Sequence, residues 1–149
     1  MTLRSTAKQK GRQWEAWIRD ALAISAGVPP SRLNLRGKSA PGCDIWPSQE
    51  VRGRLPLAVE AKARARLNPY QAMRQAEGNA YEGLIPIVAA HSRGVRLATV
   101  PLEVFLTMVS ELAAGGDPHW GMRILEKAQE LRGVLPPLKD ARVDAEEVA

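Results

Sequence analysis

The chain has 149 residues, a net charge of +5 and a single cysteine. This length suits one domain with a core of ordinary size, and one cysteine excludes both an intrachain disulfide and a zinc site built from cysteines. The basic start of the chain precedes no apolar stretch of a secretory signal, and no apolar run approaches the length of a membrane span. We therefore expect a soluble, cytoplasmic protein that does not enter a membrane.

Positive charge is concentrated in the first half of the chain. Residues 1–66 carry thirteen Lys and Arg against five Asp and Glu, whereas residues 140–149 carry four acids and one base. A basic surface favours a polyanionic partner, because each neutralised phosphate releases counterions. The same charge can simply keep a protein soluble, so charge alone does not distinguish a surface that binds a polyanion from an ordinary solvated surface.

The first half of the chain predicts one helix followed by three short strands. Apolar residues at helical spacing indicate a helix over residues 7–25, which a glycine and a proline pair end. Short strands are predicted over residues 32–36 and 43–46, on either side of a loop at 37–42 that is rich in Gly and Pro. Apolar side chains alternate over residues 57–63, which is typical of a strand with one buried face.

The middle of the chain predicts a helix and two strands. Asn68 is a good N-cap and proline follows it at the first helical position, so we expect a helix over residues 69–80. Residues 84–90 are apolar enough for a strand in the centre of a sheet. A turn then leads to a returning strand over residues 95–100.

Two more helices are predicted from Pro101 and from Pro118, each with an apolar stripe, before a Pro-rich and then acidic tail at 134–149 that we expect to be flexible. The stripes consist of Leu102, Phe105, Leu106 and Val109, and of Trp120, Ile124, Ala128 and Leu131. This order of elements predicts an α/β fold with a mixed central β-sheet flanked by helices. We expect a single domain over residues 1–135, with residues 101–133 as a helical extension.

The strand at residues 57–63 carries the most informative side chains. Glu60 and Lys62 share the face opposite the apolar residues, because side chains alternate across a strand. Asp44 lies in the preceding short strand, and pairing of the two strands would let Asp44 and Glu60 converge on one cation. These carboxylates, the Ala61 carbonyl and waters form the hard oxygen set that Mg²⁺ accepts. Lys62 could then act on a metal-bound water or neutralise charge on a phosphate.

Each of these residues also has an ordinary interpretation. A Glu-x-Lys pair on a strand is usually a solvated ion pair, and an Asp after Pro-Gly is usually a turn residue. Glu15 borders the apolar stripe of the first helix and can point toward the sheet, although a solvated glutamate is the commoner outcome. Gln71 and Gln75 lie one helical turn apart and could contact DNA or a metal-bound water, although Gln71 also occupies the capping-box position, which favours capping for that residue. Spacing alone therefore leaves the chemistry open.

Taken together, the ordered residues resemble the PD-(D/E)XK nuclease superfamily. The run Pro41-Gly-Cys-Asp44, followed by Glu60-Ala-Lys62, is similar to the bipartite motif of that superfamily. The opening Lys10-Gly-Arg-Gln-Trp-Glu15 resembles the start of the archaeal-type (Hjc) Holliday junction resolvases, which also occur in viruses. The resemblance extends over roughly residues 8–100, so it leaves out the C-terminal helices and the tail.

This resemblance implies a restriction-endonuclease-like fold and a homodimer that cuts four-way DNA junctions with Mg²⁺, for which Mn²⁺ would substitute. It implies catalytic roles for Glu15, Asp44, Glu60, Lys62, Arg36 and Ser39, a metal site at Asp44, Glu60, Ala61 and Glu15, and DNA contacts from Lys10, Arg12, Arg36, Lys38 and Arg64. Arg36 is implied to hold a phosphate, and Ser39 to lie in a mobile loop that helps catalysis.

Two residues depart from the pattern of the family. Ala16 stands where a basic residue often follows the glutamate, and Glu77 stands where an aromatic residue often lies near the dimer contact. One alternative is another nuclease of the superfamily that acts on duplex or flap DNA in repair or restriction. Others are a DNA-binding protein on this fold without catalysis, and an assembly factor that binds a partner through its C-terminal helices. A viral chain would act in the cytoplasm of its host.

Overall fold

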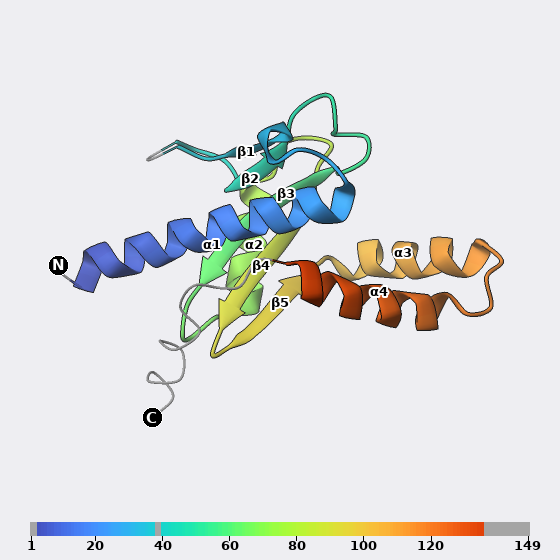
Figure 1. Cartoon of the computed structure of the whole chain (residues 1–149). Coiled ribbons are helices and arrows are strands. Elements are labelled where there is room, and N and C mark those ends of the chain that lie inside the picture. Colours follow the sequence, from blue (N-terminus) through green and yellow to red (C-terminus); the bar gives the residue numbers. More distant parts are fainter. Residues whose placement is uncertain (1–2, 38–39, 136–149) are drawn as a thin grey trace.

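The computed structural model describes residues 3–37 and 40–135 (Figure 1), so the predicted tail from residue 136 onward lies outside the described residues. The elements follow the predicted order of a helix, three strands, a helix, two strands and two helices. They are α1 (Leu3–Ala26), the 3-10 helix η1 (Pro30–Arg32), β1 (Leu33–Leu35), β2 (Ile45–Pro47), β3 (Leu57–Ala63), α2 (Pro69–Asn79), β4 (Ile85–Ser92), β5 (Val95–Thr99), α3 (Leu102–Ala114) and α4 (Trp120–Val134).

The five strands form one mixed sheet in the order β1-β2-β3-β4-β5. β1, β2 and β3 are antiparallel neighbours, β3 and β4 are parallel, and β5 returns antiparallel to β4. Parallel neighbours require a crossover connection, and α2 supplies it between β3 and β4. The prediction of an α/β fold with a mixed central sheet flanked by helices is therefore confirmed.

Helices α1 and α2 pack on opposite faces of the sheet. Trp14 of α1 shares a buried cluster with Val59 of β3, whereas Ala76 of α2 shares another with Val88 of β4. Because side chains alternate along β3, its apolar residues face α1 and leave Glu60 for the α2 side. The prediction that Glu60 lies on the face of this strand opposite its apolar residues is confirmed.

Most elements differ from the predicted bounds by one or two residues, and α1 differs by more. Helix α1 begins at Leu3 instead of residue 7, and in Figure 1 its N-terminal part extends beyond the edge of the sheet. Strand β2 spans Ile45–Pro47 instead of residues 43–46, so the proline is its last residue. Asp44 therefore precedes β2, but its backbone N–H still donates to the Val59 carbonyl over 3.0 Å.

The two C-terminal helices form as predicted, but they extend away from the sheet in Figure 1. Neither helix, each described over its full length, contains a buried residue. Phe105 in the predicted stripe of α3 remains 50% exposed, and Ile124 in that of α4 remains 48% exposed. The periodicity thus predicted the helices correctly, but none of the residues of these helices is buried in the core. Among the described residues, no helix is long and apolar enough to cross a membrane.

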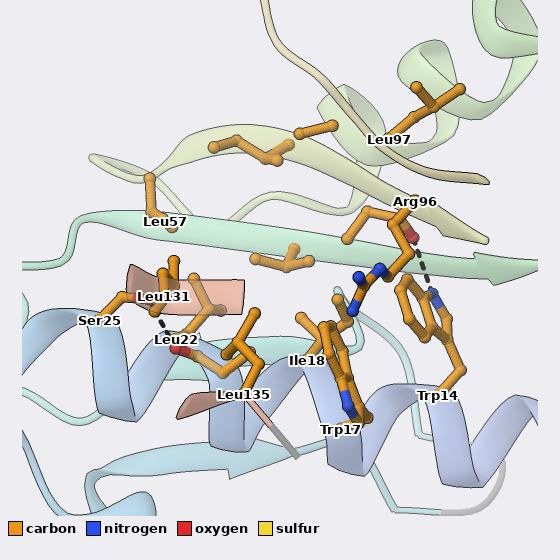
Figure 2. Close-up of a pocket in the computed structure, with 15 residues that line it drawn as sticks. Trp14, Trp17, Ile18, Leu22, Ser25, Leu57, Arg96, Leu97, Leu131 and Leu135 are labelled. Atoms are coloured by element: carbon orange, nitrogen blue, oxygen red, sulfur yellow. Dashed lines mark hydrogen bonds between the residues drawn. The ribbon is translucent and has the colours of Figure 1, made fainter. Parts of the chain in front are cut away.

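An apolar cleft of about 340 Å³ lies on the α1 face of the sheet (Figure 2). Its walls come from α1, β3, β4 and β5, and Leu131 and Leu135 close it at the end of α4. Trp17 and Arg96 lie across from each other in this cleft, with the guanidinium 5.2 Å from the ring centroid. The cleft takes in the Val59 side of β3, so it lies on the opposite face of the sheet from Glu60.

Candidate functional site

Strand pairing brings the two predicted acidic positions together. Ile45 of β2 pairs with Val59 of β3, so Asp44, one residue before Ile45, lies beside the second half of β3. The Oδ2 atom of Asp44 accepts a hydrogen bond of 2.8 Å from the Ala61 backbone N–H. The carboxylate of Asp44 is thus attached to the strand segment that carries Glu60, as the sequence predicted for paired strands.

Asp44 is a buried carboxylate with one oxygen left unsatisfied. The residue is only 2% exposed, and its Oδ1 lies 2.8 Å from Nη2 of Arg36. That contact is an ion pair without hydrogen-bond geometry, so Oδ1 has no hydrogen-bond donor among the described residues. Buried polar atoms are nearly always satisfied, so this carboxylate oxygen is a candidate ligand atom.

Glu60 and Lys62 form a buried ion pair that α2 covers. Lys62 Nζ donates to Glu60 Oε1 over 2.9 Å, and the two side chains are 11% and 1% exposed. The same ammonium donates to Gln75 Oε1 over 2.9 Å, while the Asn79 amide donates to Glu60 Oε2 over 3.4 Å. The solvated ion pair expected of an ordinary Glu-x-Lys strand is therefore not what the structure contains.

The contacts of Gln75 and Asn79 were missed from the sequence. The spacing of four residues, which places two side chains on one helical face, was the available signal. Gln75 was considered only as a residue that could contact DNA or a metal-bound water. Packing of α2 across β3 directs this face toward Glu60 and Lys62 instead.

Asn68 caps α2 as predicted, since its side chain accepts from the backbone N–H of Tyr70 and Gln71.

Burial dominates the electrostatics of the site. Burial raises the pKa of Asp44, and the nearby Glu60 carboxylate raises it further, while the hydrogen bond from the Ala61 N–H and the Arg36 charge oppose these effects. Burial also raises the pKa of Glu15, and the charge of Asp44 is the next largest cause. Asp44 is therefore close enough to Glu15 for its charge to raise the pKa of that second carboxyl group. Perturbed pKa values are common at functional sites.

Glu15 lies at the edge of this arrangement. It is half-buried on α1 and close enough to Asp44 and Glu60 for their charges to affect its pKa. However, the described part of the chain contains no group of three or more His, Cys, Asp or Glu side chains placed to hold one metal ion. The structure thus pairs Glu60 directly with Lys62 and attaches Asp44 to the backbone of Ala61 between them. It also brings Glu15 near enough to Asp44 and Glu60 for their charges to affect it.

Comparison with known proteins adds no further assignment. The chain matches no protein-family model, no curated protein and no solved structure. The chemistry of the site must therefore be argued from its side chains. Two adjacent buried carboxylates with a buried ammonium beside them can bind a hard divalent cation, and they can also hold or transfer a proton.

The loop before Asp44 depends on a glycine. Gly42 has φ +109°, a conformation that L side chains rarely adopt, and a Cβ there would collide with the Tyr81 hydroxyl. Its carbonyl accepts a hydrogen bond of 3.3 Å from Arg36 Nη1. Arg36 therefore spans the loop from Gly42 to Asp44, with a third of its side chain still exposed. Lys38 and Ser39, both predicted site residues, lie outside the described residues.

The remaining predicted residues are spread over a wider surface. Lys10 and Arg12 lie on α1, the first half-buried and the second exposed, and Arg64 is exposed directly after β3. Cys43 is fully buried in the core, and burial raises the pKa of its thiol to about 11, which disfavours the reactive thiolate.

A row of stacked rings behind the site was also missed. Trp14 stacks on Trp17 with ring centroids 5.2 Å apart, and His91 stacks on Trp14 at the same separation. The Trp14 indole N–H donates to the Ala89 carbonyl over 3.0 Å (Figure 2). The spacing of three between the tryptophans indicated a shared helix face, but the position of His91 is set by β4. This row anchors the part of α1 that carries Glu15.

Proposed function

We propose that the protein is a Mg²⁺-dependent DNA endonuclease whose site is built on Asp44, Glu60 and Lys62. The observation that carries the proposal is the pair of carboxylates, both at most 2% exposed, with Asp44 Oδ1 lacking a hydrogen-bond donor among the described residues. Burying charge is costly unless it is paired. Arg36 and Lys62 are the only cationic side chains in ion pairs with these two acids in the described ranges.

The donor set suits a small hard cation. Asp44, Glu60 and the carbonyl of Ala61 would hold Mg²⁺, with Glu15 as a more distant acid, and Mn²⁺ favours the same oxygen ligands. The unsatisfied Oδ1 of Asp44 is the atom that such an ion would satisfy. When bound, the cation would supply Lewis-acid polarisation of a phosphoryl oxygen.

In phosphodiester hydrolysis, water adds to phosphorus and the bond to the leaving oxygen breaks. Two side chains of this protein, Lys62 and Arg36, would assist this reaction. Lys62, held between Glu60 and Gln75, would neutralise the charge that develops on the phosphate or deliver a proton. Arg36 is paired with Asp44 and has a third of its side chain exposed, so it would orient a second phosphate oxygen.

The DNA substrate is proposed from charge and from the resemblance to archaeal-type (Hjc) resolvases. The basic first half of the chain suits a phosphate backbone, with Lys10, Arg12, Arg36, Lys38 and Arg64 as its contacts. A homodimer acting on four-way junctions is the proposed form, because two symmetric nicks require two related sites. A nuclease of this kind would act in the cytoplasm, or in that of the host if the chain is viral.

The alternative functions predict different outcomes in the same assays. Another nuclease of the superfamily would cut duplex or flap DNA in preference to junctions. A DNA-binding protein without catalysis would bind but cut none of them, and an assembly factor would bind no DNA. The buried contact of Lys62 with Glu60 favours catalysis over mere binding, because DNA binding alone does not require buried acids.

A cleavage assay on labelled junction, flap and duplex DNA tests the proposal. We expect junction cleavage with Mg²⁺ or Mn²⁺ and none in excess chelator. Asp44→Asn and Glu60→Gln should each abolish cleavage and keep or tighten DNA binding, since they remove negative charge near the phosphate. Glu50→Gln, an exposed surface acid paired with Arg32, is the matched control and should cleave normally.

Metal binding needs a readout that does not depend on cleavage. Titration of Mn²⁺ against the DNA-free protein, followed by calorimetry, should show a site that Asp44→Asn and Glu60→Gln each weaken. Full cleavage in chelator, or equal Mn²⁺ affinity in all variants, would show that the two acids do not form a metal site.

A further inference from the structure

The apolar cleft on the α1 face of the sheet is accessible to solvent along β5, which is an edge strand. Arg96, Leu97 and Ala98 of β5 belong to its wall and are exposed. Arg96 is the only charged side chain among the described residues that line the cleft. The ion pairs within the described part of the chain do not include this arginine. The cleft therefore presents an apolar surface with one positive charge on the β5 side.

Helix α4 brings the chain to this cleft and ends there. Leu131 and Leu135 are half-buried and line the cleft. Figure 2 shows Leu131 at the end of the cleft where Ser25 lies, and Leu135 closer to Trp17. The end of α4 thus runs along the cleft toward Trp17, over which the Arg96 guanidinium lies. The residues that follow Leu135 therefore start in the wall of the cleft that contains Arg96.

The conformation of Leu135 predicts the direction of the next side chains. Leu135 has φ −63° and ψ 138°, which is the polyproline II conformation. Pro136 and Pro137 follow it, and proline favours this conformation because its ring fixes φ. A polyproline II segment has three residues per turn and rises about 3.1 Å per residue. Leu138 is therefore expected on the same side of the chain as Leu135, about 9 Å farther on.

The sequence beyond Leu135 matches the cleft in both polarity and charge. Leu138 is the first large aliphatic residue after Leu135, and Asp140 is the first acid. Because Asp140 comes five residues after Leu135, an extended chain can place it up to about 17 Å away. Residues 136–149 carry four acids against two bases, so the positive charge of Arg96 attracts them. An apolar side chain followed by an acid complements an apolar cleft with one arginine.

Other occupants suit the cleft less well. DNA binding requires several cationic side chains along the phosphate backbone, and the described lining of this cleft offers one. A free apolar ligand would compete with a segment of the same chain, whose short tether gives it an effective concentration in the millimolar range. The segment that follows Leu135 is therefore the favoured occupant.

We propose that residues 138–140 bind in the apolar cleft of the same chain, with Leu138 against its apolar wall and the Asp140 carboxylate paired with Arg96. This contact ties the sequence after α4 to α1 and β5. It does not depend on the proposed nuclease activity, because the cleft lies on the opposite face of the sheet from Glu60. Protease sensitivity and melting temperature test it without any measurement of DNA cleavage, so either proposal can fail without the other.

Trypsin cleavage after Lys139 in the full chain reports whether the segment is bound, because Lys139 lies between the two proposed contacts. A bound segment is protected, and the rate of cleavage follows the population of the open form. We expect Leu138→Asp to be cut at this position about 10-fold faster than the wild type, since a charge does not fit the apolar wall. Val148→Asp introduces the same charge outside the contact, and it should be cut at the wild-type rate.

A peptide of residues 133–144, with and without Leu138→Asp, measures the direct effect of the substitution on trypsin. The rates in the full chain are divided by the rates in the peptides. If the wild type and Leu138→Asp are then cut equally fast, the cleft is open to another occupant and the proposal is wrong.

An exchange of charges tests the ion pair between Arg96 and Asp140. Arg96→Glu should lower the melting temperature, because the glutamate repels Asp140. Adding Asp140→Lys to the Arg96→Glu protein should raise the melting temperature again by about 2 °C, the scale of one exposed ion pair in a chain of this size. Asp144→Lys in the same background is the matched control and should restore nothing. No gain from Asp140→Lys, or an equal gain from Asp144→Lys, would overturn the proposed pairing.

Discussion

Lys62 Nζ lies 2.9 Å from Gln75 Oε1, so strand β3 and helix α2 are joined directly at the candidate site. The same ammonium holds Glu60 on its other side. Lys62 thus donates to two acceptors from two elements, which together define the position of its ammonium group. Catalytic groups must be held in such defined positions to be effective.

The contact with Gln75 predicts a positioning role for this residue. Gln75→Ala would leave Lys62 with Glu60 as its remaining acceptor among those described, and we expect the cleavage rate to fall by about 10-fold, because small misplacements are costly. Single-turnover rates at saturating DNA measure the effect apart from binding. Gln71→Ala, one turn earlier and exposed, should keep the wild-type rate. Equal rates for the two variants would remove Gln75 from the mechanism.

Replacing Lys62 separates catalysis from folding. Lys62→Ala should reduce the single-turnover rate by about 10²-fold or more, the usual scale for a positioned proton-transfer or charge-stabilising group. Lys62→Arg should restore little, because its planar guanidinium places the charge differently and stays protonated. Melting temperatures report whether each variant folds. A folded Lys62→Ala protein that cleaves normally would contradict a catalytic role.

The raised pKa of Asp44 predicts how stability depends on pH without metal. A carboxyl group with a pKa above its ordinary value of 3.8 favours the folded state while it is protonated, and this contribution is lost as the pH rises through the raised pKa. In chelator at neutral pH, Asp44→Asn should therefore melt at a higher temperature than the wild type, and the gap should narrow in acid. If the wild type is instead more stable than Asp44→Asn across this pH range, the charged Asp44 carboxylate does not destabilise the fold, and the explanation from its raised pKa is wrong.

DNA affinity should depend on the basic part of α1. Removing one phosphate contact with Lys10→Ala or Arg12→Ala should weaken junction binding and reduce the slope of log affinity against log salt by about 1. Arg132→Ala in the last turn of α4 removes the same charge far along the chain, and it should leave the slope unchanged. If all three variants bind alike, α1 is not the DNA-binding surface.

The sequence by itself determined the elements and the two faces of β3. Helical and alternating periodicities act over a few residues, so α2 with its Asn68 cap and the Glu60 face of β3 could be predicted without a partner. The sequence predicted that Asp44 would lie near Glu60 only if β2 and β3 pair. It could not show this pairing, which joins Asp44 to Ala61, because the two strands are far apart in sequence.

Only the tertiary structure decided which side chains meet and which remain uncovered. Gln75 reaches Lys62 because α2 crosses β3, and an isolated helix gives no sign of what lies beneath it. The apolar stripe around Phe105 predicted a helix correctly, but periodicity indicates an apolar side without showing what covers it. Burial depends on the packing of the whole chain, and for that reason the exposure of the apolar side chains of α3 could not be anticipated from local sequence.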